Sequence, residues 1–192
     1  MPVVVAFVAD NSSILEDSWL NSTAARLAPT SGDFKIIHCE LFFPSPVARN
    51  IVGLTGASYG IHFNGSVFKN PFKQFSKSQW IFKEIQTNHA QDAQMKAWLD
   101  DQIGKKFNYL GYASFMSPCS ISGRVPGMKK RFYCSQLTME ALNKGEVFGY
   151  HDGRPVQMPV SVHPHTLFDA ITDISTAISR PVQRKEKLKF KL

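Results

Sequence analysis

The chain of 192 residues lacks an apolar run long enough to span a membrane, and it contains neither a Gly-x-Gly-x-x-Gly motif nor a phosphate-binding loop. The sequence therefore offers no support for an integral membrane protein or for a nucleotide-binding enzyme. The apolar run at positions 2–9 is short and reaches Asp10 without a basic leader. A buried strand is therefore predicted there, and not a signal peptide.

Cysteine is also scarce, because the chain has only three. An odd, low number argues against a disulfide framework and favours a reducing intracellular compartment, such as the cytoplasm. Cys119 lies in a predicted loop without a helix behind it, which makes it a poor nucleophile. The histidine spacings fit no common zinc pattern, so neither a metal site nor a cofactor is expected.

The positive charge is concentrated at the C-terminus. The net charge is +7, and residues 180–192 hold six cations and one anion, which leaves +2 for the rest. No specific nucleic-acid binding is expected from a tail of this kind. The tail is typical of a solvated segment or a guarded edge strand. The alternative is contact with an anionic membrane through Arg184, Lys185, Lys187, Lys189 and Lys191.

The remaining sequence predicts one globular domain at 1–179, followed by the basic tail at 180–192. Hydrophobic residues make up 43% of the chain, and fifteen phenylalanines indicate an aromatic core. The patterns predict an α+β fold with an antiparallel sheet. The expected order is strand 3–9, helix 13–29, strand 34–43, loop or irregular strand 49–58, hairpin 59–68 around Asn64-Gly65, strand 79–87, helix 89–103 after Asn88, loop 107–131, helix 134–144, loop 145–164 with a short strand at 155–160, and helix 165–179.

The helix predicted to begin near Cys134 is the stretch most suggestive of chemistry. Leu137, Ala141 and Leu142 share one face, and Gly145 is a stop signal. Cys134 would then lie in or just before the first turn, where unpaired N–H groups and the helix dipole favour an anion. A thiol in that position forms its nucleophilic thiolate more readily. The alternative is a small residue buried under the helix, as free cysteines commonly are.

The strand predicted at 34–43 supplies partners for such a nucleophile. Side chains two apart share a face, so His38 and Glu40 point one way and Cys39 points the other way, into the core. A cysteine nucleophile needs a base, and the base needs an orienting group. His38 and Glu40 provide both types. Because the backbone positions of such a pair are about 6.5–7 Å apart, His62 on a neighbouring strand is the alternative third residue.

The order of these motifs resembles a known family. The strand-borne His38-x-Glu40 comes first, a helix followed by GKKFNYLG at 104–111 comes next, and FYCSQL at 132–137 comes last. This order is similar to that of the circularly permuted branch of the NlpC/P60 superfamily of papain-like cysteine hydrolases. That branch includes YiiX-like proteins, related poxvirus proteins and the lecithin:retinol acyltransferase group. The chain therefore resembles viral as well as cellular proteins. The resemblance covers roughly Ser18 to Asp173.

The resemblance implies a papain-like core in which the cysteine helix packs on the sheet that carries the histidine. It implies that Cys134 is the nucleophile, His38 the base and Glu40 or His62 the third residue, with Tyr133, Phe107 and Ser135 lining the cleft. The expected reaction is hydrolysis or acyl transfer at an amide or ester bond of a peptide, isopeptide or lipid acyl substrate. A catalytically idle papain-like module that binds a protein or membrane partner is the alternative.

Overall fold

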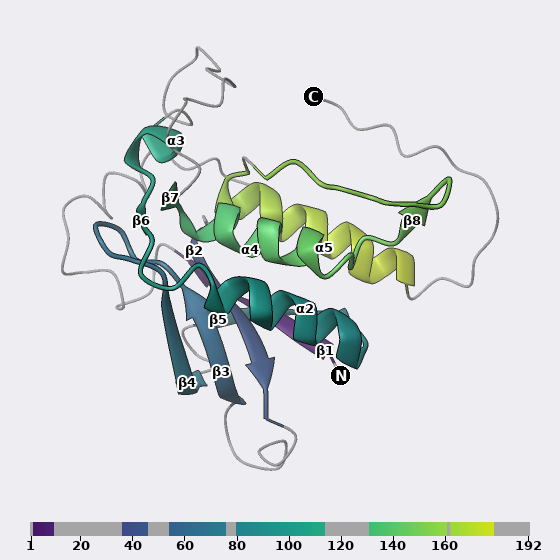
Figure 1. The fold of residues 1–192 in the computed structure, drawn as a ribbon, viewed down its shortest axis with the longest axis horizontal. Coiled ribbons are helices and arrows are strands. Elements are labelled where there is room, and N and C mark those ends of the chain that lie inside the picture. The colour runs from purple at the N-terminus through teal and green to yellow at the C-terminus, as the bar shows by residue number, and fades with distance from the viewer. Residues whose placement is uncertain are drawn as a thin grey trace.

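The computed structural model describes residues 2–9, 36–45, 54–75, 80–113, 131–160 and 162–178. The helix predicted at 13–29, Cys119 and the basic tail lie outside these ranges. The described residues form a five-stranded antiparallel sheet with the strand order β4-β3-β2-β1-β5 (Figure 1). Its strands are β1 (Pro2–Ala9), β2 (Ile36–Pro44), β3 (Leu54–Gly60), β4 (Phe68–Phe75) and β5 (Trp80–Gln86).

The three longest helices, α2 (His89–Asp100), α4 (Cys134–Lys144) and α5 (Pro164–Ile178), gather on one side of this sheet (Figure 1). Helix α4 contacts β2 and β3, and it lies between α2 and α5. The mixed architecture with an antiparallel sheet confirms the α+β prediction at this level.

Strand β1 is buried on both faces, which explains its unbroken apolar sequence. Val3, Val5 and Phe7 belong to the main core with residues of the helices. Val4, Ala6 and Val8 belong to a smaller cluster on the other face, together with residues of β2, β4 and β5. Since β1 is central and paired on both edges with β2 and β5, it forms the middle of the sheet.

Helix α4 has the predicted bounds, whereas α2 begins at His89 as predicted but ends at Asp100, before the predicted end at residue 103. Asn88 caps α2 in a capping box, in which its side chain accepts from the backbone N–H of Gln91 and the Gln91 side chain accepts from that of Asn88. Helix α4 begins at Cys134, and Gly145 forms its C-cap. The turn at Asn64-Gly65 is confirmed as well, because Asn64 has a φ of 62°, which asparagine tolerates.

The strands on either side of this turn differ in part from the prediction. The stretch at 49–58, expected to be a loop or an irregular strand, contributes most of β3, and β4 at residues 68–75 lies almost wholly beyond the predicted hairpin. Two glycines obscure the alternation in β3, and β4 is an exposed edge strand that contains Pro71. Neither strand therefore shows the clear two-residue hydrophobic period of a half-buried strand.

The two long predicted loops also contain short elements. The first includes β6 (Lys106–Phe107), α3 (Tyr109–Ala113) and β7 (Arg131–Phe132), and β6 pairs with β7 in parallel. The second includes a small hairpin of β8 (Tyr150–His151) and β9 (Arg154–Pro155). The strand expected at 155–160 was therefore wrong beyond Pro155, where residues 156–159 adopt no regular structure.

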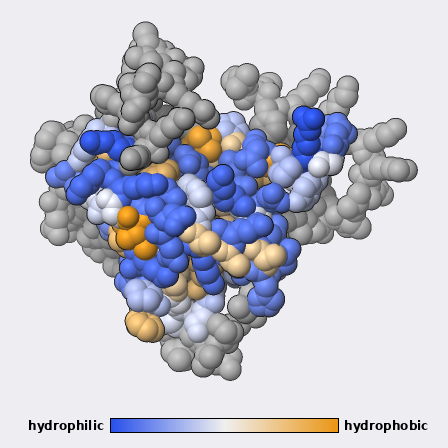
Figure 2. Space-filling view, in the orientation of Figure 1, coloured by the Kyte–Doolittle hydropathy of each residue, from blue (hydrophilic) through white to orange (hydrophobic). Residues whose placement is uncertain are grey.

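Among the described residues, no helix combines the length and the apolar character that crossing a bilayer requires. On the face shown in Figure 2, hydrophilic residues predominate and hydrophobic residues form small separate groups. The large exposed apolar side chains of the described ranges include Phe72 and Ile103.

Leu99 and Ile103 provide a matched test of this core. Leu99 has no exposed surface, whereas 47% of Ile103 is exposed. We expect Leu99→Ala to lower the free energy of unfolding by about 2–5 kcal/mol, because it leaves a cavity between α2 and the sheet. Ile103→Ala should change it by less than about 0.5 kcal/mol. Urea denaturation followed by circular dichroism measures both, and equal losses would contradict the placement of α2.

Candidate active site

Cys134 is the first residue of α4, and the helix end around it is poorly capped. Tyr133, the N-cap, has extended backbone angles and makes no side-chain capping hydrogen bond. Backbone N–H groups of the first helical turn have no carbonyl partner within their own helix, and the helix dipole adds partial positive charge there. The Cys134 side chain is only 4% exposed. The thiol thus lies in a sheltered position at the positive end of a helix.

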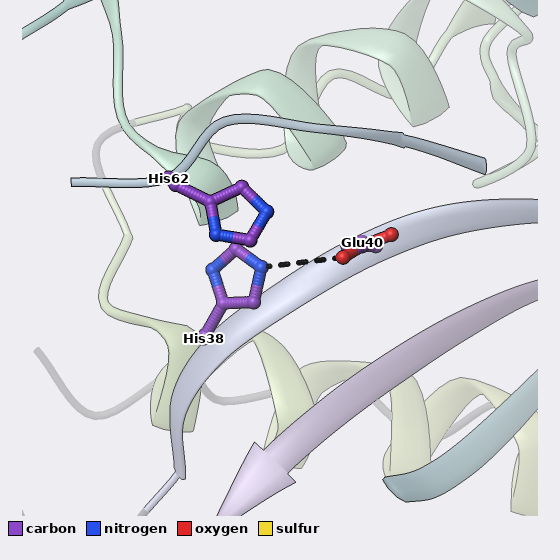
Figure 3. Close-up of side chains that lie close together, drawn as sticks. All are labelled: His38, Glu40 and His62. Atoms are coloured by element: carbon purple, nitrogen blue, oxygen red, sulfur yellow. Dashed lines mark ion pairs between the residues drawn. The ribbon is translucent and has the colours of Figure 1, made fainter. Parts of the chain in front are cut away.

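His38 and Glu40 both project from β2, as the two-residue spacing predicted (Figure 3). Nε2 of His38 lies 3.7 Å from Oε1 of Glu40, which is an ion-pair distance and longer than a hydrogen bond. The His38 side chain is 13% exposed, and that of Glu40 is fully buried. Gly60 leaves room for the carboxylate, because a methyl group at that position would approach Cγ of Glu40 to 2.9 Å.

Lys73 of β4 is a second cation beside the buried carboxylate, and no motif predicted its position there. Its Nζ lies 3.4 Å from Oε1 of Glu40 and 5.1 Å from the ring centre of Phe75. Burial by itself raises the pKa of Glu40, but the adjacent His38 and Lys73 outweigh burial and lower that pKa below its usual value. Glu40 is therefore a carboxylate at neutral pH.

The imidazole of His38 interacts with Cys134 as well as with Glu40. Burial opposes the protonated ring, yet interaction with the Cys134 thiolate and the Glu40 carboxylate raises the pKa of His38 to about 9. The pairing of β1 with β2 shifts register between Val8 and Ala9, opposite this end of β2. Such irregularities bend a strand and re-aim its side chains, and they are common beside active sites.

Cys39 also acts on the Cys134 thiol, although strand alternation predicted only a core position for it. It is fully buried, as predicted, and its Sγ lies 3.7 Å from Oγ1 of Thr138, one turn after Cys134 on α4. Hydrogen bonding from Cys39 is the main cause that lowers the pKa of Cys134 well below its usual value. Burial opposes this effect, and the charge of His38 adds to it. Burial and the Cys134 thiolate correspondingly raise the pKa of Cys39.

Tyr112 and His163 also lie within electrostatic range of Cys134. Burial, with a contribution from the thiolate, raises the pKa of Tyr112, so its phenol stays protonated. Burial lowers the pKa of His163 to about 4, although Cys134 favours its protonated form. Tyr112 lies in a segment predicted to be a loop, and His163 precedes α5. Only their long-range contacts connect them to the cysteine, which is why neither was selected from the sequence.

The other predicted site residues occupy different surroundings. His62 is exposed and follows β3, and its ring centroid lies 5.2 Å from that of His38. Tyr133 and Phe107, predicted to line the cleft, are 1% and 3% exposed and belong to the main core. Ser135 is fully buried, and its hydroxyl donates a 2.6 Å hydrogen bond to the carbonyl of Val162. This bond connects the start of α4 to the segment before α5.

Comparison with known proteins identifies no relative of this chain. No family model, curated protein or solved structure matches the chain. The resemblance to the permuted NlpC/P60 branch therefore stays a prediction. The case for chemistry depends on the arrangement of Cys134, His38, Glu40 and Cys39.

A pH profile of thiol alkylation tests the pairing of Cys134 with His38. Because the pKa of His38 is raised to about 9 and that of Cys134 is lowered, both are charged between those two values. We expect iodoacetamide to modify Cys134 well below pH 8.5, about the usual thiol pKa. His38→Ala should move the midpoint upward by about one to three pH units, because an adjacent cation is lost.

Peptide mass spectrometry assigns the modification to each cysteine in that experiment. His151→Ala is the matched control, because His151 is an exposed histidine of the β8–β9 hairpin. Its profile should equal that of the wild type. Alkylation of Cys134 only in the ordinary thiol range, in wild type and His38→Ala alike, would exclude the pair.

Cys39 permits a second and separate test of the thiolate. Cys39→Ala removes the hydrogen-bond donor and should raise the pKa of Cys134. Cys39→Ser retains a donor of similar size, so it should restore most of the low pKa. The absorbance of the thiolate near 240 nm during a pH titration measures the pKa of Cys134, with Cys134→Ala as the blank. Equal pKa values in the two Cys39 variants would assign Cys39 a packing role only.

Proposed function

We propose that this protein is a cysteine hydrolase or acyl-transfer enzyme of the papain-like type, related to the permuted NlpC/P60 branch. The observation that supports it most is the convergence of Cys134, at the start of α4, with the His38–Glu40 pair of β2. A thiolate at a helix start beside an imidazolium is the arrangement that a cysteine nucleophile requires.

In the first half of the reaction, the Cys134 thiolate attacks the carbonyl carbon of an amide or ester. The carbonyl oxygen gains negative charge, and the backbone N–H of Cys134 at the start of α4 is suited to stabilise it. The intermediate then breaks its bond to the leaving amine or alcohol, which takes the proton of His38. A thioester between Cys134 and the acyl group results.

In the second half, His38 is neutral and takes a proton from the acyl acceptor, which is water or another nucleophile. The deprotonated nucleophile attacks the thioester carbonyl, and the Cys134 thiolate leaves with the imidazolium beside it again. Glu40 acts as a positioning residue, because its carboxylate stabilises the protonated ring at 3.7 Å. His62 remains the alternative third residue, although its ring lies beside that of His38 and is exposed.

The substrate is expected to be a peptide, an isopeptide or a lipid acyl group. The tail at 180–192, which favoured a membrane-associated acyl substrate, lies outside the described residues. The site itself offers a thiolate and a base, which suit any of these carbonyl groups. A substrate panel must therefore include both amides and esters.

The proposed function is tested by measuring turnover of a p-nitrophenyl acyl ester. Peptide 7-amido-4-methylcoumarin amides are tested in parallel. We expect a burst of nitrophenol, a mass increase of one acyl group at Cys134, and its loss on hydroxylamine treatment. His38→Ala should lower kcat/KM by about 10²–10⁴-fold, which is the usual contribution of a general base. Cys134→Ala should abolish both the adduct and turnover.

His151→Ala again serves as the control that retains full activity, since it lies on the exposed hairpin. Acylation mapped to Cys39 or Cys119, or turnover that survives in Cys134→Ala, would overturn the proposal. A Cys134 that neither alkylates nor acylates would favour the alternative, an idle papain-like module that binds a partner.

A further inference from the structure

His38, Glu40 and His62 form a cluster whose composition also suits a metal ion (Figure 3). Each residue offers one ligand atom, and the three atoms lie within 4.8 Å of one another. Two imidazoles and one carboxylate are a ligand set found in zinc sites with three protein ligands and one open position. Nitrogen and oxygen donors of this kind also favour zinc over magnesium or calcium.

The cluster contains buried polar atoms that make no hydrogen bond among the described residues. Nε2 of His38 and Oε2 of Glu40 are inaccessible to solvent and make no hydrogen bond to any residue in the described ranges. Glu40 as a whole has no exposed surface. Buried polar atoms normally have partners, because leaving one unpaired costs free energy. A bound cation would satisfy both atoms at once.

An ion can reach this cluster from solvent. His62 is exposed, and the His38 side chain is 13% exposed. His38 and Glu40 belong to β2, and His62 follows the end of the neighbouring strand β3. The ligand atoms are farther apart than in a closed tetrahedral site, and rotation of the exposed His62 side chain is the simplest movement that closes it.

Lys73 is the main obstacle to a cation here. Its Nζ lies 3.4 Å from Oε1 of Glu40 and supplies part of the positive charge that a metal would provide. The Lys73 side chain is 23% exposed, and its flexible stem allows the ammonium group to move outward. Binding of a metal therefore exchanges one cation beside Glu40 for another.

We propose that His38, Glu40 and His62 bind one zinc ion. Zinc binding at these three residues needs no cysteine chemistry, so it is independent of the proposed function.

Isothermal titration of zinc chloride into the metal-free full-length chain tests the site directly. We expect one zinc ion per chain in the wild type and a loss of affinity of about tenfold or more in His62→Ala, which removes a ligand. His62 is exposed, so this variant should keep the wild-type circular dichroism spectrum and Tm. His151→Ala removes an exposed histidine elsewhere and should bind zinc like the wild type.

Cys134→Ala separates this inference from the cysteine mechanism. It should still bind one zinc ion, even if no substrate is ever found. Loss of zinc in Cys134→Ala would assign the ion to the thiolate and overturn the site. Unchanged affinity in His62→Ala, or no binding in the wild type at micromolar zinc, would overturn it as well.

Discussion

The electrostatic pairing of Cys134 with His38 depends on one packing contact, that of α4 across β2. Leu137, Ala141 and Leu142 of α4 are almost completely buried, and they hold the helix against the sheet. Apolar burial of this kind is non-directional, but it fixes where the first residue of the helix lies. The thiol is thereby placed at a helix end and next to a histidine at the same time. Each feature stabilises the thiolate, so the hydrophobic core determines the electrostatics of the site.

The buried Glu40 imposes a second constraint, which involves three neighbouring strands. A carboxylate without solvent contact is stable only when cations or hydrogen-bond donors compensate its charge. His38 of β2 and Lys73 of β4 provide that compensation, and Gly60 of β3 provides the space. Together with Cys134, the group contains two anions and two cations. Removal of any one member leaves a buried charge uncompensated, so we expect substitutions here to affect stability and reactivity together.

Local signals allowed much of the framework to be predicted from the sequence. The start of α4 at Cys134, the capping of α2 by Asn88 and the turn at Asn64 each follow from two or three neighbouring residues. Strand β3 was expected only as a loop or irregular strand, and β4 was not predicted beyond Phe68, because glycines and an exposed edge remove the hydrophobic alternation. The α+β class was predictable for the same local reasons, whereas Lys73 beside Glu40 follows only from the pairing of distant strands.

Cys39 shows why the chemistry of the site exceeded what the motifs indicated. Strand alternation correctly predicts that the Cys39 side chain enters the core, on the face opposite to His38, so no role in the site was predicted for it. The core on that side is made partly by α4, so the same burial brings Cys39 to Thr138 and Cys134. Two adjacent strand residues therefore act on one thiolate, Cys39 as a hydrogen-bond donor and His38 as a charge. A donor without a charge keeps stabilising the thiolate when His38 is neutral. Loss of the His38 proton at high pH therefore removes one of the two interactions that lower the pKa of Cys134 and leaves the other in place.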